Sequence, residues 1–181
     1  MTTAPSSLRI DETVLFPEAI PPVSPTRTCG PYCEPVENDR VALLLPGSPA
    51  YVDAVLRLLS AGVFPIPLDP RLTPTEQERI LAGLDPTAVV RTDDELAALV
   101  APLPAAGLPL GRPMHCTSGT TGVPKGVFSG LLAPDDAAAL VAEERDLWGF
   151  SPSDVNLVLS PLYHSAPLRF AMGTILAGGR I

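Results

Sequence analysis

One segment of the sequence combines small residues, hydroxyls and a lysine, and it runs from Thr117 to Gly126 as TSGTTGVPKG. Glycines permit backbone conformations that other residues avoid, and they let a ligand approach the main chain closely. Consecutive amides in such a turn form a concave nest for anionic oxygens, to which hydroxyls add donors and Lys125 adds a positive charge. The pattern therefore predicts a cradle for a polyphosphate. Its predicted members are Thr117, Ser118, Gly119, Thr120, Thr121, Gly122, Lys125 and Gly126.

The same segment is open to other interpretations. A flexible polar surface loop has the same composition, because Ser, Thr and Gly favour turns in any protein. A Walker A loop is excluded, since Pro124 stands where that motif has its second glycine. The sequence also lacks the Gly-x-Gly-x-x-Gly pattern, so a dinucleotide-binding fingerprint is not indicated.

Cysteine and histidine spacing suggests a second chemistry, a zinc site. Cys29 and Cys33 are separated by three residues, and His115 lies beside Cys116. The second Cys or His pair of a usual zinc site is missing, so no metal is expected and half-buried thiols are the simpler interpretation. Three cysteines without an export signal favour reduced thiols, and the predicted location is the cytoplasm.

Alternating strand and helix patterns precede the loop. Short apolar runs predict buried strands at 41–45, 63–68 and 88–90. The second is expected at a sheet edge, because Pro65 and Pro67 remove amide donors. Helix starts are predicted by N-cap residues or capping boxes at Ser48, Thr73 and Thr92. This succession predicts an α/β fold in which a parallel sheet has flanking helices and right-handed crossovers.

After these elements, residues 101–113 hold four prolines and two glycines and predict a surface loop or linker. Further elements are predicted as a strand at 114–117, a helix at 134–147, a strand at 155–159 and a helix at 166–177. Residues 176–181 indicate a helix stop and the first residue of another strand. Since a strand normally needs about five residues, the pattern suggests part of a longer fold.

Composition excludes several classes of protein. Of 181 residues, 46% are hydrophobic and 18% are charged, which is typical of a chain that packs a core rather than a disordered one. The net charge is −8 and no basic patch is visible, so nucleic acid is not an expected partner. No uncharged apolar run reaches about 18 residues, so no transmembrane segment is expected.

The segment Thr117–Gly126 is similar to the signature phosphate loop of the AMP-forming adenylating enzymes, which include acyl-CoA synthetases, luciferases and the adenylation domains of peptide synthetases. Residues 41–90 resemble the family's first sheet region, and residues 160–167, SPLYHSAP, are similar to its next motif. CoA ligases commonly carry an aromatic-His pair in that motif, whereas peptide synthetases usually carry Phe-Asp. Tyr163 and His164 therefore favour a CoA ligase. The resemblance covers about residues 40–181.

The resemblance implies a two-step reaction with ATP, Mg²⁺ and CoA, in which a fatty or aromatic carboxylic acid becomes an acyl-adenylate and is captured by CoA or a carrier thiol. The loop would stabilise the departing pyrophosphate. Tyr163 and His164 would line the acyl or thiol pocket, and no residue is assigned as a catalytic base. Aromatic residues nearby are expected in the core or the pocket wall: Trp148, Phe150 and Phe170.

Several later motifs of the family have no counterpart in the sequence, namely the Tyr-Gly-x-Thr-Glu segment, the ribose-binding Asp and the C-terminal lysine. The expected organisation is an irregular arm at 1–39 and a partial AMP-binding domain at 40–181, truncated before the adenine and ribose motifs. One hypothesis is the N-terminal portion of a carboxylate–CoA ligase, inactive alone. The other is an inactive remnant or a split subunit whose partner chain supplies the rest. The fragment hypothesis predicts an open sheet edge and exposed apolar surface, which the missing part would cover.

Overall fold

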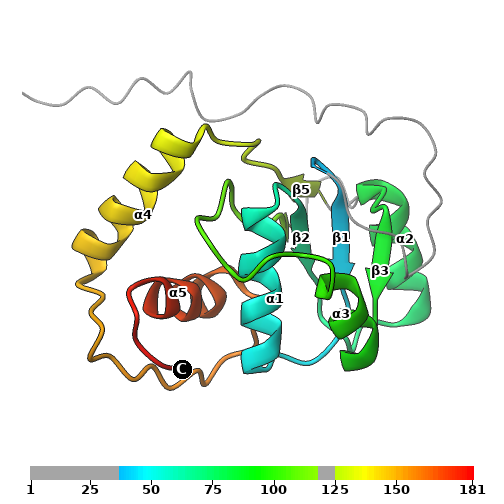
Figure 1. The fold of residues 1–181 in the computed structure, drawn as a ribbon. Helices are drawn as coiled ribbons and strands as arrows, with labels where there is room; N and C mark the ends of the chain where they lie inside the picture. Colours follow the sequence, from blue (N-terminus) through cyan, green and yellow to red (C-terminus); the bar gives the residue numbers. More distant parts are fainter. Residues whose placement is uncertain (1–36, 118–124) are drawn as a thin grey trace, which may run out of the picture.

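The computed structural model describes residues 37–117 and 125–181. A parallel three-stranded sheet is formed by β1 (Arg40–Leu43), β2 (Phe64–Pro67) and β3 (Ala88–Val90), in the order β2-β1-β3 (Figure 1). In register, Val41 lies opposite Pro65 on one side and Ala88 on the other. The predicted α/β fold with a parallel sheet and flanking helices is confirmed. The proline-containing strand β2 is at the edge of this sheet, as expected.

Three helices connect and cover the strands: α1 (Pro49–Ser60), α2 (Pro74–Leu84) and α3 (Asp93–Val100). Their predicted starts are confirmed. The Ser48 hydroxyl accepts a hydrogen bond from the Tyr51 amide at 3.1 Å. Thr73 with Glu76 and Thr92 with Glu95 form complete capping boxes, each satisfying amides that the first helical turn leaves unpaired.

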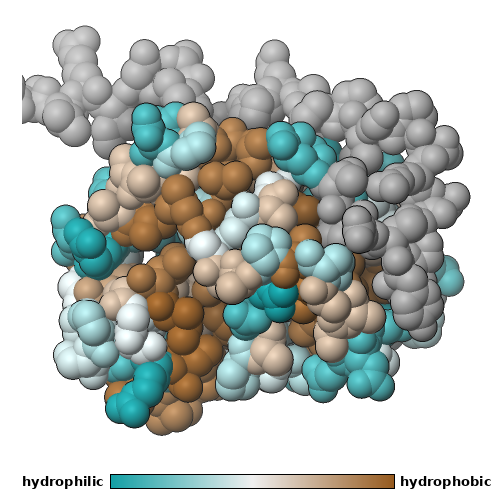
Figure 2. All heavy atoms as spheres, in the orientation of Figure 1, coloured by the Kyte–Doolittle hydropathy of each residue, from teal (hydrophilic) through white to brown (hydrophobic). Residues whose placement is uncertain are grey.

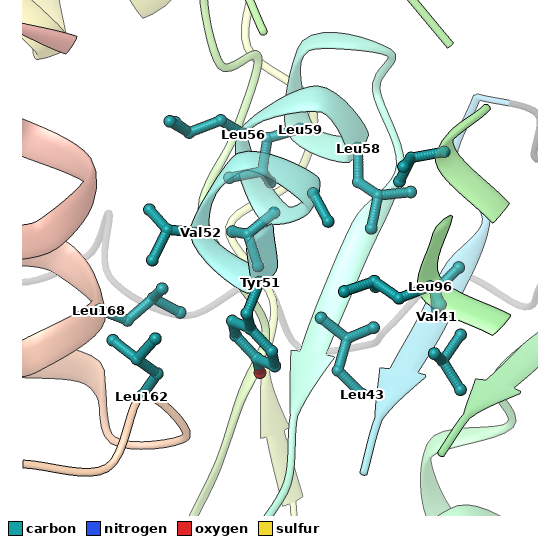
Figure 3. Close-up of a cluster of buried hydrophobic side chains, with 14 of the residues drawn as sticks. Val41, Leu43, Tyr51, Val52, Leu56, Leu58, Leu59, Leu96, Leu162 and Leu168 are labelled. Carbon is teal, nitrogen blue, oxygen red and sulfur yellow. The ribbon is translucent and has the colours of Figure 1, made fainter. Parts of the chain in front are cut away.

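Helix α1 lies at the centre of the main core (Figure 3). Most of its side chains are buried rather than one stripe alone: Tyr51, Val52, Ala54, Val55, Leu56, Leu58 and Leu59. Figure 3 shows Leu162 and Leu168 on one side of α1, and Leu43 of β1 and Leu96 of α3 on the other. Each fully buried leucine contributes roughly 1.5–3 kcal/mol. Helix α1 therefore joins the parallel sheet to the C-terminal part of the chain.

The C-terminal part contains an antiparallel pair, β4 (His115–Thr117) and β5 (Lys125–Val127), and the helices α4 (Pro134–Trp148) and α5 (Ser165–Leu176). The Met114 amide donates to the Pro65 carbonyl at 2.9 Å and so holds β4 beside β2. Strand β5 was not predicted, because Lys125–Val127 is too short to show a strand pattern. The two C-terminal helices were predicted.

The strand predicted at 155–159 is wrong. The structure has a single parallel bridge there, between Val155 and Arg180, in which the Asn156 amide donates to the Arg180 carbonyl at 2.8 Å. The rest of the segment is not part of any strand in the described chain. Three alternate side chains of the segment are 67%, 77% and 84% exposed, and we call them the apolar row: Val155, Leu157 and Leu159. The alternation is that of a strand, but no described segment covers this face. The predicted stop of α5 is confirmed by Gly178, whose φ is +85°.

No helix in the ranges 37–117 and 125–181 combines the length and apolar character needed to cross a bilayer.

Candidate functional site

The ends of the predicted phosphate loop are held together by backbone pairing. Thr117 ends β4 and lies opposite Lys125, which begins β5, so residues 118–124 start and finish at one cross-strand pair. Lys125 is exposed. The predictions for Ser118, Gly119, Thr120, Thr121 and Gly122 fall outside the described residues. The structure thus places the two ends of the candidate loop, on strands anchored to the domain.

Gly126 is needed for close packing rather than for an unusual backbone conformation. It is not among the described glycines with positive φ, so it does not use the conformational freedom that glycine permits. A Cβ at this position would lie 2.0 Å from Met114 Cε and 2.9 Å from Leu84 Cδ2. Met114 and Leu84 are both buried, so β5 is pressed directly onto the smaller of the two cores. The root of the loop is therefore packed against α2 and β4.

Tyr163 lies in a cluster with the Asp69–Arg71 turn that follows β2. Arg71 Nη2 donates to the Tyr163 hydroxyl at 2.6 Å and pairs with Asp69 Oδ2 at 2.9 Å. Hydrogen bonds from the Arg71 guanidinium lower the pKa of Asp69 to about 2, and a hydrogen bond from the Tyr163 hydroxyl makes a smaller contribution to this shift. The sequence analysis gave Arg71 no role, although it belongs to the segment that resembles the family.

The two histidines of the chain lie near this cluster. The His164 and Tyr163 rings are 4.5 Å apart at their centroids and inclined by 53°, and His164 is the N-cap residue of α5. His115 is half-buried in β4, and burial lowers its pKa. A hydrogen bond that the His115 ring donates to the backbone carbonyl of Tyr163 opposes this effect, and the nearby His164 adds to it. Sequence reasoning considered His115 only as a zinc ligand and did not connect it with His164.

A metal centre receives no support from the described residues, which contain no group of three His, Cys, Asp or Glu side chains able to hold an ion. Cys29 and Cys33 lie outside those residues. Burial raises the pKa of the Cys116 thiol to about 11, so at neutral pH it is a protonated, half-buried group.

A cavity of about 570 Å³ lies beside this region, between α4, α5, β5 and the loop that precedes β4. Figure 2 shows apolar residues gathered around the hollow between α4 and the rest of the molecule. Trp148 and Phe170, which were expected in the core or the pocket wall, line this cavity with their rings 5.0 Å apart. His115 and Ser165 also reach the cavity wall. Phe150 lies behind, packed against Gly173.

Three charged residues form one network in the cavity wall. Glu144 Oε1 accepts from Arg169 Nη2 at 2.7 Å and Nε at 3.0 Å, and the same oxygen lies 2.5 Å from Arg112 Nη2. These contacts join α4 to α5 and to the loop before β4. Of the described residues in the wall, Glu144 is the sole carboxylate.

The known proteins that this chain resembles in sequence and in structure belong to the AMP-forming adenylating superfamily. No family model matches the chain. It is 34% identical over 168 residues to a feruloyl-CoA synthase of Amycolatopsis sp., covering 80% of this chain and 33% of that one. It is 30% identical to the pyochelin synthetase PchF of Pseudomonas aeruginosa, covering 78% of this chain and 9% of that one. The crystal structure of ATP-bound MatB from Rhodopseudomonas palustris aligns with a TM-score of 0.56 and 26% identity, over 80% of this chain and 34% of that one. The chain thus spans about a third of the length of the feruloyl-CoA synthase.

Proposed function

We propose that this chain, which belongs to the superfamily of AMP-forming adenylating enzymes, supplies the pyrophosphate-binding loop and part of the substrate wall of a carboxylate–CoA ligase. The observation that carries the proposal is the Thr117–Lys125 cross-strand pair, which joins the two ends of the loop and places an exposed lysine at its root. The homology to a feruloyl-CoA synthase over 80% of the chain supports it.

The proposed chemistry begins with attack of a substrate carboxylate oxygen on the α-phosphorus of ATP. A new phosphorus–oxygen bond forms, the bond to the bridging oxygen breaks, and pyrophosphate leaves. Negative charge accumulates on the leaving group, and backbone amides, the loop hydroxyls and Lys125 would stabilise it there. A thiol then attacks the acyl carbon and AMP departs. The described residues offer no carboxylate cluster for Mg²⁺, so no step is assigned to the ion, which would arrive with ATP.

The choice of CoA as the thiol rests on Tyr163 and His164. Both lie at the start of α5, and His164 stacks obliquely on the Tyr163 ring near His115. We assign them to the wall of the acyl or thiol pocket, as positioning groups. A carrier-protein thiol is the competing acceptor, and the 30% identity to a pyochelin synthetase supports it.

We further propose that residues 40–181 are part of an AMP-binding domain whose adenine and ribose motifs lie on another segment or on a partner chain. The exposed apolar row supports this, since Val155, Leu157 and Leu159 alternate as in a covered strand. The 181-residue chain alone is then expected to show no ATP–pyrophosphate exchange. Exchange above background with a fatty or aromatic acid would contradict this proposal. Co-purification with a chain that carries a Tyr-Gly-x-Thr-Glu segment would favour the split-subunit alternative.

Lys125 offers a direct test of the phosphate loop, because it is the sole lysine in the sequence. Reductive labelling with pyridoxal phosphate, followed by peptide mapping, would report on this residue, and the N-terminal amine serves as an internal control. We expect ATP or tripolyphosphate to slow labelling of Lys125 and to leave the N-terminal amine unaffected. Equal labelling with and without either polyphosphate would refute the assignment.

A further inference from the structure

We propose that Arg71 is a positioning residue, which holds the Tyr163 ring and through it orients the His164 imidazole. The inference rests on the proposed function for the location of Tyr163 and His164 in the wall of the acyl or thiol pocket. It adds to that site a residue from the turn after β2, 92 positions before Tyr163 in the chain.

Arg71 belongs to a hydrogen-bonded turn between β2 and α2. The Leu72 amide donates to the Asp69 carbonyl at 3.2 Å, and Pro70 occupies the second position of the turn, which suits the fixed φ of proline. The Leu72 carbonyl accepts a hydrogen bond from the Gln77 side chain of α2 at 2.9 Å. The backbone of Arg71 is therefore fixed between a strand and a helix.

The guanidinium of Arg71 also has a defined orientation. Its Nε and Nη2 donate to the two carboxylate oxygens of Asp69 at 3.0 and 2.9 Å, and this bidentate pairing sets the plane of the group. Asp69, with a pKa of about 2, is ionised at neutral pH. Because Nη2 carries two hydrogens, it also donates to the Tyr163 hydroxyl, at 2.6 Å.

Tyr163 is held at two points. Its hydroxyl accepts from Arg71, and its backbone carbonyl accepts from the His115 ring in β4. The first bond fixes the tyrosine ring, whereas the second fixes the main chain. Loss of the Arg71 bond should therefore release the ring and leave the backbone of Tyr163 in place.

The orientation of His164 depends on the Tyr163 ring. Although His164 is the N-cap residue of α5, its side chain makes no capping hydrogen bond in the described structure. The residue is exposed, and its ring centroid lies 4.5 Å from that of Tyr163. An exposed side chain of this kind has several rotamers open to it, and contact between aromatic rings selects among them.

The experiment is NMR spectroscopy of the 181-residue chain, in which His115 and His164 are the only two histidines. The ring current of Tyr163 shifts the imidazole resonances of His164, and a His164→Gln spectrum assigns them. Spectra at about pH 8.5, where an ordinary imidazole is neutral, avoid effects of the lost arginine charge on histidine titration.

In Arg71→Gln we expect the His164 resonances to move toward their positions in the urea-unfolded chain. Those of His115 should change less, because His115 bonds the Tyr163 backbone rather than its ring. The melting temperature should be nearly unchanged, since an exposed ion pair contributes little to stability.

Two further variants test the route through Tyr163. Tyr163→Phe keeps the ring and removes the hydroxyl, so it should reproduce the His164 shift of Arg71→Gln, and combining the two substitutions should add nothing. Arg91→Gln is the matched control, because Arg91 also follows a strand of the parallel sheet but donates to Gln77 at 2.8 Å. It should leave the His164 resonances unchanged.

Unchanged His164 resonances in Arg71→Gln would overturn the proposal, and so would an equal shift in Arg91→Gln or additive shifts from Arg71→Gln and Tyr163→Phe. Equal movement of both histidines together with a lower melting temperature would show a general structural role instead. These spectra contain no nucleotide, so their failure is distinct from a failure of polyphosphate protection at Lys125, which tests the proposed function separately.

Discussion

Substitution of Gly126 by alanine tests whether the root of the phosphate loop is set by packing. The new Cβ would lie 2.0 Å from Met114 Cε, and ordinary contact begins at 3.4 Å, so the methionine must move. Met114 is fully buried and has little room to do so. Overpacking of this kind costs about 1–3 kcal/mol, moderated here by the flexibility of methionine.

A smaller effect opposes this cost. Gly126 does not have a positive φ, so alanine fits its backbone, and the loss of glycine freedom in the unfolded chain stabilises by about 0.4–1 kcal/mol. The net expectation is a destabilisation of about 1–2 kcal/mol, or a fall in Tm of about 3–6 °C for a domain of this size. Once Met114→Ala has emptied that contact, the cost of Gly126→Ala should fall, and only the 2.9 Å approach to Leu84 Cδ2 remains to be relieved.

The assay is urea or thermal unfolding of the four proteins of this double-mutant cycle, followed by circular dichroism. Gly107→Ala is the matched control, because the nearest atom to its new Cβ is Ser60 Oγ at 3.8 Å and its φ is not positive. We expect this control to be neutral or slightly stabilising. The packing argument fails if Gly126→Ala is as stable as the control, or if its cost is unchanged in the Met114→Ala background.

Four further outcomes follow from individual groups. Tyr51→Phe should raise the free energy of unfolding by about 1 kcal/mol, because the buried hydroxyl has no hydrogen-bond partner within the described structure; a loss in urea unfolding would contradict this. Cys116, with its pKa raised to about 11, should react with iodoacetamide at pH 8 more slowly than glutathione, as followed by peptide mapping. Burial lowers the pKa of His115, so its contribution to stability is full above an unfolded value near 6.5 and declines as the pH falls below it; His115→Gln should reduce that decline in unfolding experiments. Replacing Leu157 and Leu159 with serine should reduce ANS fluorescence and light scattering, and unchanged signals would count against the apolar row as the source.

Local signals allowed much of the first half to be predicted from sequence. Ser48, Thr73 and Thr92 are N-caps whose hydrogen bonds reach only three residues along the chain, and the structure has all three. The prolines of β2 correctly placed it at a sheet edge. Such signals can be recognised in the sequence because the residues that determine the structure lie within the same helical turn or strand that they stabilise.

Contacts between distant segments explain what sequence reasoning missed. Arg71 and Tyr163 are 92 positions apart, so their hydrogen bond leaves no periodic trace. Strand β5 depends on pairing with β4 and on the Gly126–Met114 contact, neither of which Lys125–Val127 encodes alone. The strand expected at 155–159 failed for the opposite reason. Its alternation is present, but a strand also requires a neighbour, and the described chain supplies one bridge, to Arg180.

The two candidate binding regions share the strands β4 and β5 but are otherwise supported by different parts of the protein. The loop root depends on Met114 and Leu84 in the smaller core, whereas the cavity depends on α4 and α5, which the Glu144 network joins. Helix α1 contacts both β2, which lies beside the loop root, and α5, which lines the cavity. It therefore fixes the distance between β2 and α5. A cavity-forming change in α1, such as Leu56→Ala, should therefore disturb both regions, while Gly126→Ala and Arg169→Gln should each affect one. A mutant set that failed to separate in this way would mean that the loop root and the cavity form a single site.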